Sequence, residues 1–185
     1  MPRVYIGVGS NIEPEINIPK ALRMLSEVMP IAAVSTFYRT PELGQIGADA
    51  SGGILARSIG AEFINGMVAI EADLPPRELK FDVLRGIETA LGRVRGPDKC
   101  EPRTIDLDIA VYGDLVVCED DLVIPDPDIT SRAFLAAPLL ELDPAMVLPG
   151  SGERLAGAVS RMPMDDMTPL ECFTRQLRQE MRLEP

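Results

Sequence analysis

The run Asp106-Leu107-Asp108 places two carboxylates on alternate residues of a segment that has the pattern of a β-strand. The odd positions of segment 105–111 are all apolar, and alternate side chains of a strand share one face. We therefore expect Asp106 and Asp108 to project together from the other face. Neighbouring carboxylates resist ionising together unless a cation compensates for their repulsion. A hard cation such as Mg²⁺, which prefers oxygen ligands, fits this need. The alternative is an exposed edge strand whose carboxylates face water.

Basic residues gather just before these carboxylates, although the chain as a whole is acidic. The segment 93–103 contains four cations (Arg93, Arg95, Lys99, Arg103) and two acids (Asp98, Glu101). Phosphoryl transfer needs cations close to metal-binding carboxylates, because its charge lies on phosphate oxygens. A solvated helix end with basic residues near its C-terminus would give the same cluster. Together with the acidic pair, the cluster favours a magnesium-dependent phosphoryl-transfer enzyme.

The composition excludes several other classes of function. The net charge of −11 argues against a nucleic-acid partner. The sequence contains no histidine, so imidazole catalysis is excluded and zinc lacks its usual ligands. No apolar run approaches the roughly 20 residues of a membrane helix. Three widely spaced cysteines and the absence of a secretion signal predict a cytoplasmic protein without disulfides.

Hydrophobic periodicity predicts the elements that must position these residues. Strands are expected at 4–9, 31–39, 62–71 and 104–112, a hairpin at 115–124, and helices at 17–29, 75–92 and 167–182. The first of these strands is expected to end in a tight turn at Gly9, and Asp73 is expected to cap the helix at 75–92. That helix should expose Arg85 and Glu88 on its outer face. This order favours an α+β fold with a ferredoxin-like sheet, although a doubly wound parallel sheet fits the same pattern.

Several segments together resemble the 6-hydroxymethyl-7,8-dihydropterin pyrophosphokinase family. They are Tyr5 to Asn11, Phe37 to Gly44, Phe63 to Asn65, Gly92 to Arg95, Pro102 to Ile109, Arg132 to Phe134 and Pro138-Leu139. Their order and spacing hold over roughly residues 3–150. The resemblance implies a ferredoxin-like sheet with helices on both faces, in a three-layer α/β/α arrangement. It also implies an enzyme of folate biosynthesis that transfers diphosphate from ATP to a pterin alcohol and releases AMP.

The resemblance also implies roles for individual residues. The catalytic residues would be Arg93, Arg103, Asp106 and Asp108, with two Mg²⁺ ions held by Asp106 and Asp108. The ATP side would involve Glu88, Arg95, Lys99, Arg103, Ile109 and Arg132. The pterin side would involve Thr40, Leu43, Gly44, Asn65 and two stacking rings, Phe63 and Phe134.

The sequence departs from the family pattern at a few positions. Asp126-Pro127 stands where the family often has His-Tyr, Cys100 replaces a Trp, and Glu101 replaces a Gly. The changes at Asp126-Pro127 and Cys100 motivate one alternative, a non-catalytic pterin- or nucleotide-binding paralogue. A further alternative is another two-metal enzyme, such as a nucleotidyltransferase, that carries its carboxylates on a strand.

The organisation of the chain follows from the same comparison of segments. We expect a catalytic domain over residues 1–160 and a helical extension over 161–185. The apolar stripe of the extension would dock on the core or support a homodimer. The glycine-rich loop 44–62 is expected to close over substrate.

Overall fold

A computed structural model describes residues 1–41, 47–48, 54–55, 62–94 and 102–183 of the chain. Among these residues, six strands form one sheet in the order β10-β3-β6-β1-β7, with β2 also pairing with β6. These strands are β1 (Arg3–Ser10), β2 (Ile31–Val34), β3 (Tyr38–Thr40), β6 (Phe63–Glu71), β7 (Asp106–Tyr112) and β10 (Thr168–Pro169). Two short separate pairs are β4 (Gly47–Ala48) with β5 (Ile54–Leu55) and β8 (Val117–Glu119) with β9 (Leu122–Ile124).

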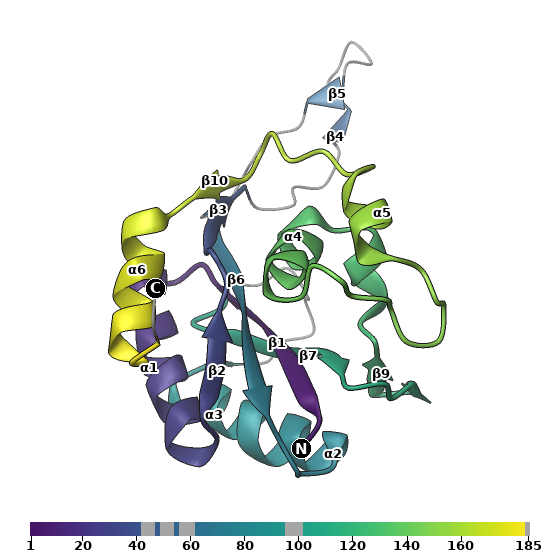
Figure 1. Ribbon diagram of the computed structural model, residues 1–185. Helices are drawn as coiled ribbons and strands as arrows, with labels where there is room; N and C mark the ends of the chain where they lie inside the picture. The colour runs from purple at the N-terminus through teal and green to yellow at the C-terminus, as the bar shows by residue number, and fades with distance from the viewer. Residues whose placement is uncertain (42–46, 49–53, 56–61, 95–101, 184–185) are drawn as a thin grey trace.

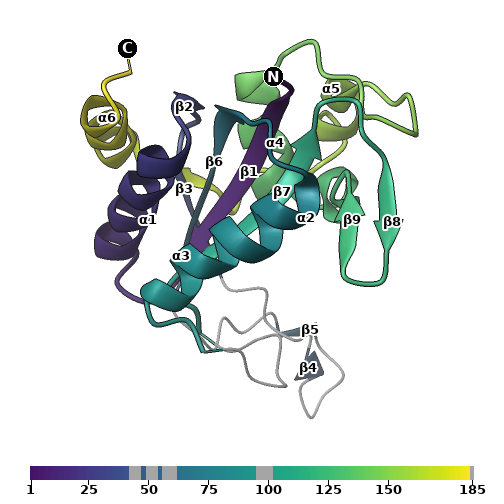
Figure 2. The same cartoon turned by 90° about the horizontal axis from the view of Figure 1, so that it is seen from below.

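Helices cover both faces of the sheet (Figures 1 and 2). One face carries α1 (Pro14–Val28) and a continuous helical segment made of α2 (Pro76–Glu78), the π-helix η1 (Leu79–Leu84) and α3 (Arg85–Ala90). The other face carries η2 (Pro127–Thr130, a 3₁₀ helix), α4 (Ala133–Leu142) and α5 (Leu155–Val159). The last helix, α6 (Glu171–Glu180), lies beside α1 and β2. The expected three-layer α/β/α arrangement is confirmed.

The strand pairing identifies the topology. β2 and β3 both pair with β6, so they act as two halves of one bent strand. With that strand counted once, the order is the second, third, first and fourth strand along the chain, as in a ferredoxin-like sheet. All the pairings of this sheet are antiparallel, which excludes the doubly wound parallel alternative.

Two hydrophobic cores sit on the two faces of the sheet. The larger one joins the sheet to α1, α3 and α6 through residues such as Ile6, Leu22 and Ile87. The smaller one joins the sheet to α4 and α5 through residues such as Met67 and Leu139. Strands buried on both faces read as continuous apolar runs, which explains the apolar stretches of β1 and β6. None of the helices in the described ranges is long and apolar enough to cross a membrane.

A β-bulge in β7 corrects one expectation about side-chain direction. Ile6 faces Ile109 and Tyr5 faces Val111, so Ala110 is an extra residue on β7. The bulge reverses the alternation beyond it. Ile109 therefore lies in the larger core, whereas Val111 lies in the smaller one. The prediction that the odd positions of 105–111 share one apolar face holds through Ile109 and is wrong at Val111.

The helical segment 76–90 corrects two further expectations. It begins at Pro76 with Pro75 as the capping residue and no side-chain hydrogen bond, so Asp73 is not its N-cap. Its middle is a π-helix, and the extra residue of a π-turn rotates the following residues relative to a regular α-helix. Glu88 is consequently 1% exposed, against the expectation that it lies on the outer face.

Three other features of the secondary structure differ from the expectations. The strand expected at 31–39 is interrupted at 35–37, where the Ser35 hydroxyl accepts a hydrogen bond from the Met67 amide at 2.9 Å. Helix α4 was not among the expected helices, and it contains Pro138 in its interior. The tight turn expected at Gly9 is also absent, since β1 continues through Ser10.

The C-terminal segment packs on the rest of the chain. β10 pairs with β3, the Leu177 side chain is fully buried, and the rings of Phe37 and Phe173 meet edge to face at 5.9 Å. The apolar stripe of α6 therefore docks on the core, as one of the two expectations had it. The domain boundary near residue 160 and the homodimer stay predictions.

Candidate active site

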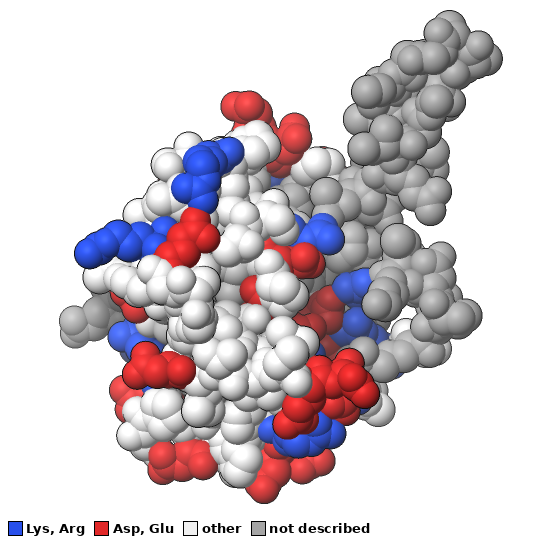
Figure 3. All heavy atoms as spheres, turned by 90° about the vertical axis from the view of Figure 1, so that its right-hand side faces the viewer, with Lys and Arg blue, Asp and Glu red and all other residues white. Residues whose placement is uncertain are grey.

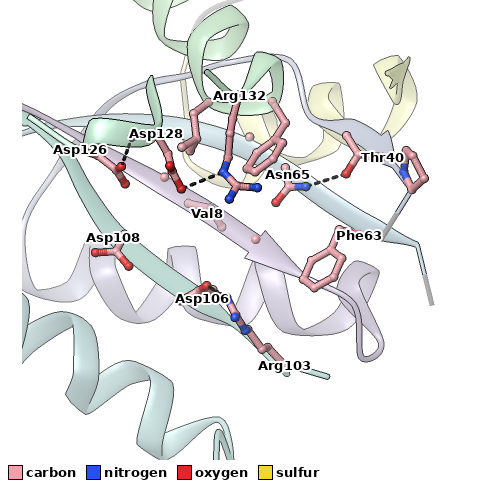
Figure 4. Close-up of a pocket in the computed structure, with 16 residues that line it drawn as sticks. Val8, Thr40, Phe63, Asn65, Arg103, Asp106, Asp108, Asp126, Asp128 and Arg132 are labelled. Atoms are coloured by element: carbon pink, nitrogen blue, oxygen red, sulfur yellow. Dashed lines mark hydrogen bonds and ion pairs between the residues drawn. The ribbon is translucent and has the colours of Figure 1, made fainter. Parts of the chain in front are cut away.

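A pocket of about 520 Å³ opens beside the strands β1, β6 and β7, under η2 and the start of α4 (Figure 4). It brings together eight of the residues singled out from the sequence: Thr40, Phe63, Asn65, Arg103, Asp106, Asp108, Arg132 and Phe134. The remaining lining residues are Gly7, Val8, Gly9, Pro41, Gly66, Asp126, Asp128 and Leu135. Residues far apart in the sequence thus form one site.

Asp106 is the most tightly held carboxylate of the pocket. One of its oxygens pairs with Arg93 and the other with Arg103. Burial alone would raise the pKa of Asp106, but the two guanidinium groups outweigh burial and hold the pKa below its ordinary value. Asp106 is therefore an anion over the whole neutral range, and its charge is already compensated within the protein.

Asp108 lies two residues further along β7 and is more open to solvent. Its side chain is 55% exposed, compared with 23% for Asp106. Its Oδ1 pairs with the ammonium group of Lys80, which reaches it from η1. The expectation that Asp106 and Asp108 project from the same face is confirmed, since both line the pocket.

Arg103 is positioned through its backbone. The Asn11 side chain accepts a hydrogen bond from the Arg103 amide at 2.6 Å, and the Arg103 carbonyl accepts from the Asn11 amide at 3.1 Å. The Ser10 hydroxyl donates to the next carbonyl, that of Thr104, at 2.7 Å. The end of β1 therefore fixes the approach to β7 and delivers the Arg103 guanidinium to the pocket.

The pocket is also lined by aromatic and amide groups. Phe63 and Phe134 both line it, and Asn65 donates a hydrogen bond to the Thr40 hydroxyl at 2.8 Å. Gly9 lies directly opposite Asn65 in the sheet. A Cβ at Gly9 would come within 2.7 Å of Asn65 Oδ1, so the bare backbone of Gly9 leaves the space that this amide occupies. Aromatic rings next to a fixed amide suit a flat ligand with polar edges.

A third group of charges comes from η2. The Asp126 side chain accepts a hydrogen bond from the Asp128 amide at 2.8 Å, and Arg132 pairs with Asp128 at 2.8 Å. Burial raises the pKa of Asp126, and the carboxylates of Asp108 and Asp128 raise it further, against the hydrogen bond from Asp128 and the charge of Lys80. The Asp126-Pro127 departure noted in the sequence thus adds an acidic group to the pocket wall.

Not every expected residue lines the pocket. Glu88 and Arg93 lie behind it, where Arg93 pairs with both Glu88 and Asp106. The side chain of Ile109 is 2% exposed in the larger core, which leaves only its backbone for a contact with nucleotide. Leu43, Gly44, Arg95, Lys99, Cys100 and Glu101 lie outside the described residues. Most of the expected closing loop 44–62 also lies outside them.

The donor set of the acidic pair fits a magnesium ion. In the described ranges, no three Asp, Glu, Cys or His side chains form a group that could hold a metal by themselves. Mg²⁺ commonly binds through one or two carboxylates, with phosphate oxygens and water as its other ligands. Asp106 and Asp108 provide such a pair at the pocket wall, with guanidinium groups beside them. A site of this kind is suited to phosphoryl transfer.

Three residues that matter in this geometry were not expected from the sequence. Nothing in the sequence singled out Lys80, because an isolated lysine in a helix normally faces solvent. Gly9 was interpreted as part of a turn, whereas its role is to leave space for Asn65. Only the family resemblance pointed to Asn11, because this residue ends the matching segment from Tyr5 to Asn11.

Comparison with known protein families matches residues 5–144 to the family described as 7,8-dihydro-6-hydroxymethylpterin-pyrophosphokinase (HPPK). The 2-amino-4-hydroxy-6-hydroxymethyldihydropteridine pyrophosphokinase of Methylorubrum extorquens is 36% identical over 159 residues, covering 84% of this chain and 92% of that relative. The protein of the same name from Pseudomonas aeruginosa is 34% identical over 166 residues, covering 88% and 93%.

Solved structures agree on the fold. A crystal structure of Plasmodium falciparum HPPK-DHPS A437G with STZ-DHP has a TM-score of 0.65 and 12% sequence identity. The match covers 86% of this chain and 45% of that longer one. At this identity the likeness supports the fold alone. With the family match and the relatives, the chain belongs to the HPPK family and is a pyrophosphokinase-class enzyme.

Proposed function

We propose that the protein transfers diphosphate from ATP to 6-hydroxymethyl-7,8-dihydropterin in a magnesium-dependent reaction of folate biosynthesis. The observation that carries the proposal is that one pocket is lined both by an acidic pair with a guanidinium group and by two aromatic rings with a fixed amide. Family membership supports the reaction class, and the relatives' names support the pterin substrate.

In the proposed reaction the hydroxymethyl oxygen of the pterin attacks the β-phosphorus of ATP. A new oxygen–phosphorus bond forms, the bond from the β-phosphorus to the oxygen bridging to the α-phosphorus breaks, and AMP leaves. The hydroxyl proton is lost to the medium. Asp106 and Asp108 would hold two Mg²⁺ ions, and the bound ions would supply positive charge to neutralise the phosphate oxygens.

The protein's own residues bind and orient the two substrates. Phe63 and Phe134 would stack on the pterin ring, while Asn65 and Thr40 would bind its polar edge. Arg103 would stabilise the charge of the transferred group, because its guanidinium already lies at the carboxylate pair. Arg93 positions Asp106 from behind, and Asp106 and Glu88 hold the pKa of Arg93 above its ordinary value against the opposing effect of burial.

The nucleotide would lie toward η2, where Arg132 is presented by its ion pair with Asp128. Arg95, Lys99 and the backbone of Ile109 are proposed to complete this side, and Leu43 and Gly44 the pterin side. Figure 3 shows acidic and basic side chains lying next to one another on the face drawn there. Small mixed groups of charge suit a small anionic substrate better than a nucleic acid.

A cytoplasmic location is part of the proposal. It agrees with Cys118 and Cys172, which are free in the structure. Homodimer formation stays a prediction that would need a surface other than the apolar stripe of α6.

The test is loss of AMP formation in Asp106→Ala and Asp108→Ala, each with ATP, Mg²⁺ and the pterin alcohol. Losses of at least about 100-fold are expected, because each carboxylate would hold a charge-neutralising cation. The far-ultraviolet circular dichroism of both variants should match the wild type. Full activity of either folded variant would refute the assignment. Pterin binding without any turnover of the wild type would favour a non-catalytic paralogue, and pyrophosphate release would favour a nucleotidyltransferase.

A further inference from the structure

Lys80 is a buried lysine next to the candidate metal site. Its side chain is 8% exposed, and its ammonium nitrogen pairs with Asp108 Oδ1 and donates to the Leu107 carbonyl at 3.2 Å. Taking an ammonium group out of water is costly unless opposite charge and hydrogen bonds compensate. The compensation for Lys80 comes from β7, at and beside one of the two carboxylates assigned to the metal.

The π-helix explains how a helical lysine reaches this position. Lys80 and Glu88 are the two charged residues that this helical segment buries, and they are eight positions apart. Two regular helical turns span about 7.2 residues, and the π-turn adds about one more. Residues eight apart then fall on the same line, facing β7. π-turns are often found at functional sites.

These two side chains hold the backbone between the acidic residues. Glu88 accepts a hydrogen bond from the Leu107 amide at 2.9 Å, and Lys80 donates to the Leu107 carbonyl. β7 lies at the edge of the sheet, so its outer backbone groups need partners from outside the sheet. Lys80 and Glu88 supply them at the residue that separates Asp106 from Asp108.

We propose that Lys80 positions the Asp108 carboxylate and also serves as its resident counter-ion. A divalent cation that binds Asp108 must displace or oppose this positive charge. The inference rests on the proposed function, because it takes Asp108 as a metal ligand. With the Lys80 charge at Asp108, a free divalent cation meets a site whose carboxylates are already compensated. The phosphates of the nucleotide restore the negative charge, so the metal enters chiefly together with nucleotide.

The direct test measures Mn²⁺ binding to the nucleotide-free protein. The electron paramagnetic resonance signal of the free ion reports how much Mn²⁺ remains unbound. In Lys80→Met, which keeps the length of the apolar stem, Mn²⁺ should bind about tenfold more tightly than in the wild type, because the nearby positive charge is gone. Lys20→Met is the matched control, since Lys20 is exposed on α1, and its affinity should not change. Lys80→Arg keeps the charge and should not tighten binding.

A second measurement uses the wild-type protein, so it does not depend on whether a variant folds. The sequence has three lysines, Lys20, Lys80 and Lys99, so their ¹⁵N ammonium resonances can be resolved. The Lys80 resonance should be protected from solvent exchange and should shift when Mg²⁺ and a non-hydrolysable nucleotide are added. The Lys20 resonance should do neither.

The outcomes separate this inference from the proposed function. The role of Lys80 is overturned if Lys80→Met binds Mn²⁺ within twofold of the wild type, or if the Lys80 resonance does not shift. In either case, AMP formation by the wild type would still support the proposed function. Asp108→Asn should weaken metal binding in the presence of nucleotide. If it does not, the metal assignment itself is wrong.

Discussion

Gly9→Ala places a methyl group against the amide that we assign to the pterin. The new Cβ would lie 2.7 Å from Asn65 Oδ1, whereas ordinary contact begins near 3.4 Å. Asn65 must therefore retreat by about 0.7 Å, the difference between these two distances. Its hydrogen bond to Thr40, now 2.8 Å, would stretch to the limit of a hydrogen bond. The substitution thus disturbs the pterin end of the pocket without removing a functional group.

The expected magnitude follows from the loss of one hydrogen bond to the substrate. Such a bond contributes about 0.5–1.5 kcal/mol, which corresponds to a rise of about 2- to 13-fold in KM for the pterin. The acidic pair keeps its ion partners, so metal binding in the presence of nucleotide should stay within about twofold. The effect should appear in the pterin KM and leave the KM for ATP unchanged.

The assay is steady-state AMP formation with the pterin and ATP varied in turn. Gly86→Ala is the matched control, because a Cβ at Gly86 meets no atom within 4 Å. That control should keep both KM values and gain up to about 1 kcal/mol in stability, as alanine is the better helix former. An unchanged pterin KM in Gly9→Ala, or an equal rise in both KM values, would show that the reasoning about Asn65 is wrong.

Two further predictions concern stability. Thr174→Val should lower the free energy of unfolding by about 1–3 kcal/mol, because the buried Phe37 amide donates to the Thr174 hydroxyl at 2.9 Å. Urea denaturation measures this free energy, and Thr174→Ser, which keeps the hydroxyl, should have the stability of the wild type. A Thr174→Val variant as stable as the wild type would contradict the prediction. Asp126→Asn should raise the denaturation midpoint at pH 7. Burial and the carboxylates of Asp108 and Asp128 raise the pKa of Asp126 in the folded state, so its ionised form opposes folding above that pKa. The gain should disappear below the ordinary carboxyl pKa of about 3.9, and a gain that persists there would argue against this cause.

Local patterns in the sequence were sufficient for the three central strands of the sheet and for the acidic pair. Alternation and apolar content predicted β1, β6 and β7, and strand parity correctly placed Asp106 and Asp108 on one face. These features depend on neighbours within a few residues. The resemblance, rather than any local pattern, was needed to single out Phe63 and Phe134, because a lone aromatic residue is normally a core residue.

The features that the sequence did not reveal depend on single extra residues or on distant partners. One extra residue in η1 turned Glu88 and Lys80 inward, and one in β7 turned Val111 to the opposite core. A prediction from regular helical or strand periodicity does not allow for such an extra residue, so it places the residues beyond it on the wrong face. The buried charge of Glu88 is acceptable only because Arg93 and the Leu107 amide meet it, and those partners are brought there by the fold.

The identity of the products formed from ATP tests the central claim most directly. With Mg²⁺, ATP and 6-hydroxymethyl-7,8-dihydropterin, ³¹P nuclear magnetic resonance should show AMP and a pterin diphosphate appearing in equal amounts. Both should be absent without the pterin. Formation of ADP with a pterin monophosphate, or of pyrophosphate, would contradict the assignment of the pocket to diphosphate transfer.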